Sequence, residues 1–288
     1  MTNPIQDYFS KAETILEKIR LQEDNIRKAS NWFAGSILSG RMVHLFGSGH
    51  SRIMTEEMWP RYGSFPGFNP IVELSLTYHN NVVGPNGQRQ AMFLENVTGL
   101  AERILRNFVL TETDTALIIS SSGTNTVPVE MAEQFQLRGI KVVALITLDH
   151  STASKSKRTD GKKLGDFADL VLDSGAPAGD AMVKVDGLIT PVSPGSTLGG
   201  VLIINSIKAE IARILTEAGH PPKVLTAACN VAIKKQKNFL NLLMMNTQRC
   251  YRNYIHLTYN CSYVKDSNNS GRLLPFSRLA GIFQQEPG

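Results

Sequence analysis

Two apolar runs in this chain each end in a short loop rich in glycine and hydroxyl residues, and a helix-compatible segment follows each loop. The first run, residues 42–46, leads into Gly-Ser-Gly-His-Ser at 47–51. The second, 115–119, leads into Ser-Ser-Ser-Gly-Thr-Asn-Thr at 120–126. A strand, a tight loop and a helix start in direct succession are typical of parallel sheets covered by helices. This repeated unit predicts an α/β fold.

Further apolar runs extend this unit to a whole domain. Strands are predicted at 71–74, 141–147 and 170–172, alternating with helical segments. The pattern indicates a doubly wound, mainly parallel five-stranded sheet with helices on both faces. Upstream, apolar residues recur at three- and four-residue steps to about Leu38, which predicts one long helix or two successive helices.

The chain divides into three predicted segments: an N-terminal helical extension at 1–38, a ligand-binding domain at 39–228 and an atypical tail at 229–288. The tail lacks apolar periodicity, so we expect it to be disordered or to result from a frameshift. If the DNA behind residues 232–250 is read one nucleotide earlier, codons can be chosen that encode an amphipathic helix.

Composition narrows the classes of partner. The 288 residues are 42% hydrophobic and carry a formal charge of +5, but the basic residues are scattered and not interleaved with aromatics. We therefore expect no nucleic-acid partner, whereas an anionic small molecule fits the mild positive excess. No run approaches the roughly 20 apolar residues of a membrane helix, and no signal sequence opens the chain, so we expect a cytoplasmic protein. The three cysteines show no pairing or metal-ligand spacing, and we expect no metal and no cofactor.

Both hydroxyl loops are candidate anion sites, because backbone N–H groups converge at a helix N-terminus and hydroxyl side chains add donors. An ordinary glycine turn for the first loop and a serine N-cap for the second remain the alternatives. A third such start, with Ser196 or Thr197 as its cap, precedes a long apolar helix from Leu198. The candidate binding residues are Gly47, Ser48, Gly49, Ser51, Ser120, Ser121, Ser122, Thr124, Asn125 and Ser196.

Two ionisable residues can be placed relative to these loops. His150 follows the strand at 141–147 and lies at the carboxyl end of the sheet, where it is a candidate catalytic group. A loop histidine without a catalytic role is the alternative. Glu95 falls within a helix predicted at 90–108, and a solvated position is favoured for it over one that faces a ligand.

Together, Gly-Ser-Gly-His-Ser, Ser-Ser-Ser-Gly-Thr-Asn and the Pro-Gly-Ser-Thr at 194–197 resemble the sugar isomerase (SIS) domain family, most closely its small uncharacterised bacterial branch. The resemblance covers about residues 1–228. It implies a phosphosugar ligand and a homodimer or homotetramer. In the related phosphoheptose isomerases the second loop holds the sugar phosphate, which implies this role for Ser120, Ser121, Ser122 and Thr124.

A catalytic base is also implied by resemblance. The glutamate of the isomerases would fall near Arg61, and the helix that starts at Thr197 contains no histidine. The N-acetylmuramic acid 6-phosphate etherase has a Glu-Cys-Pro-Pro-Thr-Phe-Gly run similar to residues 57–63, which marks Glu57 as a candidate base. The neighbouring Glu56 or partial burial would raise its pKa toward neutrality. The alternative is a first-turn glutamate that interacts with the helix dipole.

Three functions follow from the resemblance. The first expectation is an aldose–ketose sugar-phosphate isomerase that abstracts a proton next to a carbonyl. The alternatives are an etherase-type lyase acting on an amino-sugar 6-phosphate and a sugar-phosphate sensor without catalysis. Kinship of fold does not choose among the three.

Overall fold

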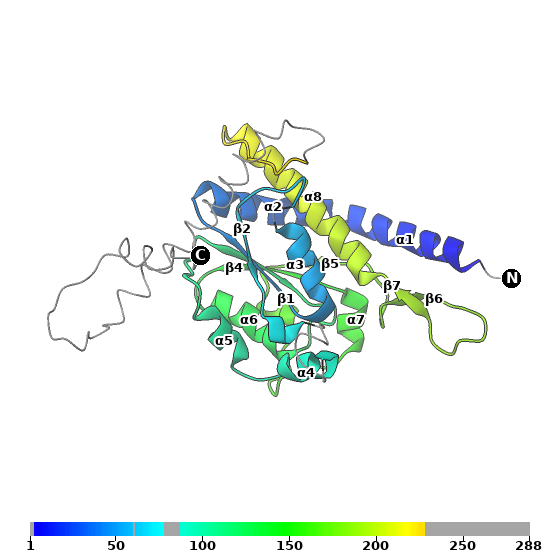
Figure 1. Cartoon of the computed structure of the whole chain (residues 1–288). Coiled ribbons are helices and arrows are strands. Elements are labelled where there is room, and N and C mark those ends of the chain that lie inside the picture. The colour runs from blue at the N-terminus through cyan, green and yellow to red at the C-terminus, as the bar shows by residue number, and fades with distance from the viewer. Residues whose placement is uncertain (1–2, 60, 78–86, 228–288) are drawn as a thin grey trace, which may run out of the picture. The chain divides into compact units, whose positions relative to one another are not determined.

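A computed structural model describes residues 3–59, 61–77 and 87–227, and the tail predicted at 229–288 lies outside these ranges. The centre of the fold is a five-stranded sheet in the order β2-β1-β3-β4-β5, in which all neighbouring strands are parallel (Figure 1). The strands are β1 (Val43–Gly47), β2 (Phe68–Ile71), β3 (Thr115–Ile119), β4 (Lys141–Ile146) and β5 (Leu170–Asp173). The predicted doubly wound α/β fold is confirmed, although β2 begins three residues before the predicted 71–74.

Alternating side chains give each strand two apolar faces. Leu45 and Leu117 point to one face of the sheet, whereas Phe46 and Ile118 belong to a second cluster on the other face. All of these side chains are at most 1% exposed. A strand buried on both sides reads as a continuous apolar run, which explains why the strands were visible in the sequence.

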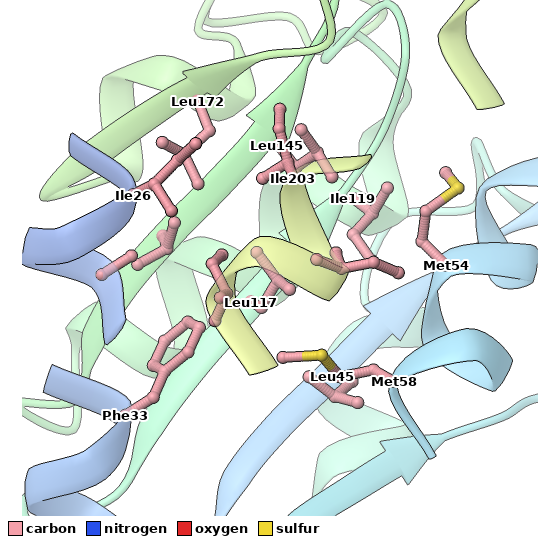
Figure 2. Close-up of a cluster of buried hydrophobic side chains, with 14 of the residues drawn as sticks. Ile26, Phe33, Leu45, Met54, Met58, Leu117, Ile119, Leu145, Leu172 and Ile203 are labelled. Carbon is pink, nitrogen blue, oxygen red and sulfur yellow. The ribbon is translucent and has the colours of Figure 1, made fainter. Parts of the chain in front are cut away.

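Four helices cover the first face: α1 (Pro4–Arg20), α2 (Glu23–Leu38), α3 (Arg52–Met58) and α8 (Ser196–Glu217). Figure 2 shows Ile26 and Phe33 of α2 with Ile203 of α8 among the side chains of the strands. The N-terminal extension therefore contributes to this same core. It forms two helices, and Gln22 between them exchanges 2.8 Å hydrogen bonds with both backbone groups of Asp173 in β5.

The opposite face is covered by α5 (Leu100–Leu105), α6 (Thr126–Gln136) and the 3-10 helix η3 (Leu164–Phe167). Shorter elements complete the described part of the chain: η1 (Gly49–Ser51), η2 (Leu74–Leu76), α4 (Gly87–Leu94) and α7 (Leu148–Ala153). Within the described ranges, no helix combines the length and the apolar character needed to cross a membrane.

The local structure differs from the sequence prediction in two places. The helix predicted at 90–108 is broken, since α4 ends at Leu94 and α5 begins only after Gly99, which has a left-handed φ of 82°. Glycine tolerates this conformation, and the turn redirects the chain. The antiparallel hairpin of β6 (Ala181–Val183) and β7 (Val192–Pro194) was not predicted at all, because its three-residue strands are too short to show a pattern.

A buried carboxylate joins the amino ends of β1 and β3. Asp114 accepts hydrogen bonds from the Arg41 guanidinium at 3.0 and 3.1 Å and from the backbone amides of Met42 and Thr111. His44 Nε2 lies 3.3 Å from its Oδ2. Burial by itself raises the pKa of Asp114, but the bonds from His44 and Arg41 outweigh it and hold this pKa well below its ordinary value.

Asp114→Asn is therefore expected to destabilise the fold by about 2 kcal/mol at pH 7, because a group that accepts charged hydrogen bonds is lost. A lowered pKa adds stability above the unfolded-state value near 4 and loses it as the pH falls further. The difference in free energy of unfolding between Asp114→Asn and wild type should therefore shrink from pH 7 to pH 3 in urea titrations. Asp160→Asn, which removes an exposed partner of Arg158, is the matched control. Equal effects of the two substitutions would contradict this role for Asp114.

Candidate functional site

One cavity of about 720 Å³ lies at the carboxyl ends of the central strands. Its walls come from the loops after β1, β3 and β4, the end of α4 and the start of α8. Parallel α/β sheets bind ligands at this position, because the loops that leave neighbouring strands meet there.

The loop after β3 contributes the densest set of polar groups. Ser120, Ser121, Ser122, Thr124 and Asn125 all line the cavity. Gly123, with a φ of 62°, makes the tight turn, and its amide donates to the Ser120 carbonyl at 3.1 Å. The Leu164 amide fixes the Gly123 carbonyl at 2.8 Å. The loop thus presents four hydroxyl groups at the N-terminus of the 11-residue α6, an arrangement suited to an anion.

The loop after β1 divides into lining and shaping residues. Ser48, His50 and Ser51 line the cavity, whereas Gly47 and Gly49 are not among the lining residues. A Cβ atom on Gly47 would lie 2.6 Å from the Ser51 carbonyl oxygen, so only glycine permits this turn. Gly47 therefore sets the shape of the loop, whereas a direct contact of Gly47 or Gly49 with a ligand stays a prediction.

Glu95 is the buried acid of the cavity. It follows the last residue of α4, is 7% exposed and lines the cavity wall. Ser48 Oγ donates to its Oε2 at 2.8 Å. Burial raises the pKa of Glu95, and the hydrogen bond from Ser48 opposes this rise only in part. The solvated position favoured from sequence was wrong, although the spacing of four residues from the buried Ala91 could have revealed it.

Glu57 lies elsewhere and is not among the lining residues of the cavity. Its carboxylate pairs with Arg61 and accepts a hydrogen bond from Asn205 at 3.2 Å. Lys208 of α8 lies 3.8 Å from Glu57 Oε1 and donates to its backbone carbonyl at 2.8 Å. Burial raises the pKa of Glu57, but Arg61, Asn205 and Lys208 together bring it below its ordinary value. These contacts join α3 to α8 and favour a permanently ionised carboxylate.

His150, in α7, does line the cavity. Its Nδ1 is buried, and none of the described residues hydrogen-bonds it. Burying such a nitrogen unpaired is unfavourable, so a ligand group that bonds it would be favoured.

Ser196 also lines the cavity, but its hydroxyl donates to Asp180 Oδ2 at 2.8 Å. Asp180 Oδ1 accepts from the backbone amides of Gly195 and Ser196 at 3.0 and 2.7 Å. The carboxylate of Asp180 thus occupies the N-terminus of α8, where Ser196 or Thr197 was the predicted cap. Sequence could not reveal this cap, because Asp180 lies 16 residues before Ser196, on the other side of the β6–β7 hairpin.

Sequence reasoning missed further lining residues, and four of them add hydroxyl groups or positive charge. Thr147 and Ser174 follow β4 and β5 and form a chain of hydroxyl groups with Ser121, with oxygen separations of 3.2 and 2.6 Å. Lys155 and Lys157 add positive charge to the wall next to the loop after β3, since the Lys157 amide bonds the Thr124 carbonyl at 3.0 Å. The cluster of lysines after residue 154 was the sequence signal that could have revealed this positive charge.

Comparison with known proteins gives consistent matches. The model of the SIS domain matches residues 7–147. The UPF0309 protein BH3325 from Halalkalibacterium halodurans is 33% identical over 79% of this chain and 92% of its own length. The UPF0309 protein lin2794 from Listeria innocua is 33% identical over 76% of this chain and 87% of its own length.

A solved phosphoheptose isomerase from Francisella tularensis is a more distant match. It is 18% identical, with a TM-score of 0.46, over 73% of this chain and 96% of its own. At this distance the likeness carries no conclusion about substrate or reaction.

Proposed function

This chain belongs to the UPF0309 family of SIS-domain proteins, and we propose that its cavity binds a phosphorylated sugar or amino sugar. The observation that carries this proposal is the meeting of the hydroxyl loop after β3 with the buried Glu95 in one cavity. The loop and the N-terminus of α6 supply donors for a phosphate. The Glu95 carboxylate can act as a base, because it lies outside the loop that would hold the phosphate.

The reaction that we propose is aldose–ketose isomerisation. Glu95 takes the proton from the carbon next to the carbonyl and returns it to the neighbouring carbon, while His150 carries the proton that moves between the two oxygens. A base for this step works best with a pKa raised toward neutrality, and burial raises the pKa of Glu95. In this proposal Glu95 takes the role that the resemblance suggested for Glu57.

An etherase-type lyase is the second candidate. The same proton abstraction would start it. A carbon–carbon double bond would then form as the C–O bond on the next carbon breaks, and the ether oxygen would take up a proton and leave with its alkyl group as an alcohol. The Ser196 hydroxyl on the cavity wall favours this alternative, because the etherase resemblance includes Gly195-Ser196-Thr197. A sensor without catalysis is the third candidate, but binding alone needs no buried carboxylate with a raised pKa.

A thermal-shift panel tests the proposal. A ligand that binds only the folded state raises the melting temperature with its concentration, so phosphorylated sugars and amino sugars should stabilise the protein and their unphosphorylated forms should not. Product analysis on each stabilising compound then separates isomerase, lyase and sensor. No stabilisation by any phosphosugar would contradict the proposed ligand class. We also propose that the protein is cytoplasmic and forms a homodimer or a homotetramer. Light scattering of the purified protein would measure its oligomeric state.

Lys155 and Lys157 are expected to assist phosphate capture. They lie two residues apart, and the intervening Ser156 bonds the Lys162 carbonyl instead. Replacing both by alanine should weaken phosphosugar binding by roughly tenfold at low salt, and less at high salt, because exposed charges are screened.

The control for this prediction removes the same charge elsewhere, with Lys11→Ala and Lys162→Ala combined, since neither residue is among the lining residues. Titration calorimetry at two salt concentrations measures both double variants. If the control weakens binding as much, the effect comes from net charge and not from this part of the wall.

A further inference from the structure

A hydroxyl chain, made by Ser121, Thr147 and Ser174, runs along the cavity wall from the loop after β3 to the end of β5. The register of β3, β4 and β5 places these residues side by side, just beyond the ends of the strands. Backbone bonds continue this register, since the Thr147 amide donates to the Ser121 carbonyl at 2.9 Å and the Ser174 amide to the Ile146 carbonyl at 2.7 Å. The sheet itself therefore holds the hydroxyl chain in place.

The middle and the far end of the hydroxyl chain are buried. Thr147 is 0% and Ser174 is 3% exposed, yet both line the cavity together with Ser121. Thr147 Oγ1 lies 3.2 Å from Ser121 Oγ and 2.6 Å from Ser174 Oγ. Among the described residues, neither Ser121 Oγ nor Ser174 Oγ has another hydrogen-bond partner. A ligand in the cavity is therefore the partner available to each end.

A count of protons shows how the two ends depend on each other. Each hydroxyl carries one proton, and the two bonds of the hydroxyl chain use two of the three. If Ser121 donates to Thr147, the remaining proton lies on Ser174, and in the opposite direction it lies on Ser121. An ionised phosphate oxygen at the loop after β3 accepts the Ser121 proton, so Thr147 must then donate to Ser121 and Ser174 to Thr147. Ser174 is left with lone pairs only.

We propose that the hydroxyl chain couples phosphate binding at Ser121 to recognition of a hydrogen-bond donor of the sugar, an O–H or N–H group, at Ser174. This inference rests on the proposed function of the cavity. Thr147 and Ser174 are then specificity-determining residues. A sugar group that can only accept, such as an ether or carbonyl oxygen, is disfavoured beside Ser174, because a buried acceptor without a donor loses free energy.

Titration calorimetry of the full chain tests the coupling, with inorganic phosphate and glucosamine 6-phosphate as probes. The second probe carries both O–H and N–H donors. Ser174→Ala should weaken its binding by roughly three- to tenfold, the usual value of one hydrogen bond, and should leave phosphate binding within twofold of wild type. Thr147→Val should do the same, because the Ser174 proton then has no buried acceptor and turns toward the sugar donor. The double variant should bind no more weakly than the weaker single variant, since both substitutions break one chain.

The control variants remove the same groups from the exposed side of α8. Thr216→Val and Ser206→Ala each lose a hydroxyl that bonds a carbonyl of the same helix, at 2.7 and 2.9 Å, and neither residue lines the cavity. Both should bind the two probes like wild type. Thr147→Ser keeps the hydroxyl and should retain the affinity that Thr147→Val loses, which separates the hydroxyl chain from packing.

Two results would overturn the coupling while leaving the phosphate site intact. One is a double variant whose loss equals the product of the two single losses. The other is glucosamine 6-phosphate that binds no more tightly than phosphate, or binds Thr147→Ser as weakly as Thr147→Val. A wild-type protein that bound neither probe would instead contradict the proposed function, and the coupling would fall with it.

Discussion

Glu95→Gln should lower kcat/KM for any sugar phosphate that the protein converts by roughly 10² to 10⁴-fold, the usual contribution of a general base. Glutamine keeps the size of the side chain and an oxygen that can accept from Ser48, but it cannot take a proton. The loss should appear in kcat and not in binding, because the proposed phosphate contacts lie in the loop after β3. Steady-state kinetics on the substrate identified by the thermal-shift panel provides the measurement.

The same substitution should stabilise the fold at alkaline pH. A pKa raised by burial means that ionised Glu95 destabilises the native state above that pKa, whereas both states hold the proton below about pH 4. The melting temperature of Glu95→Gln should therefore exceed that of wild type at pH 8 and approach it at pH 4. A variant that is less active and more stable is expected where a functional group is held in an unfavourable environment.

Glu57→Gln is the companion variant that decides between the two acids. The Glu57 carboxylate is engaged by Arg61 and Asn205 and is not among the residues that line the cavity. Full turnover in Glu57→Gln together with its loss in Glu95→Gln would support Glu95 as the base. The reverse result would return the role to Glu57.

Gly199→Ala should have the largest effect on stability, more than about 4 kcal/mol, and should deplete folded protein. Gly199 lies in the first turn of α8, where a Cβ atom would stand 1.8 Å from the Ser174 carbonyl oxygen. The obstacle is backbone at the end of β5, so neither side can yield without moving the helix. Moving α8 would also displace Ser196 and Ser174 from the cavity wall, so any folded fraction should bind phosphosugars weakly.

Gly35→Ala is the matched control for the same chemical change. Gly35 lies within α2, and an added Cβ there meets nothing within 4 Å. Alanine is favoured over glycine in such a position by roughly 0.5–1 kcal/mol, so this variant should be slightly more stable than wild type. Urea titration compares the two. A Gly199→Ala protein as stable as Gly35→Ala would show that α8 does not need its close approach to β5.

Sequence alone was sufficient for the architecture and for part of the site. Continuous apolar runs predict strands buried on both faces, and the runs at 42–46, 115–119 and 141–147 correspond closely to β1, β3 and β4. The loops after β1 and β3 could be placed at one edge of the sheet, because parallel topology puts the carboxyl ends of its strands together. These inferences depend on local periodicity and on a general rule of chain connection.

The identity of the acid required the tertiary structure. Glu57 and Glu95 each lie on or beside a short helix near a loop. The four-residue spacing from Ala91 indicates that Glu95 faces inward, but it does not identify the cavity that Glu95 lines. The break at Gly99 and the packing of α4 turn Glu95 into the cavity, whereas Lys208 and Asn205, far along the chain, draw Glu57 to α8.

Burial, and with it the direction of each pKa shift, arises from contacts between residues distant in sequence. The cap that Asp180 provides for α8 and the bond between Ser48 and Glu95 have the same origin. The sheet and the hydroxyl loop at its edge thus follow from local sequence patterns. The carboxylate that meets this loop is set by packing between distant parts of the chain, because that packing removes particular side chains from water.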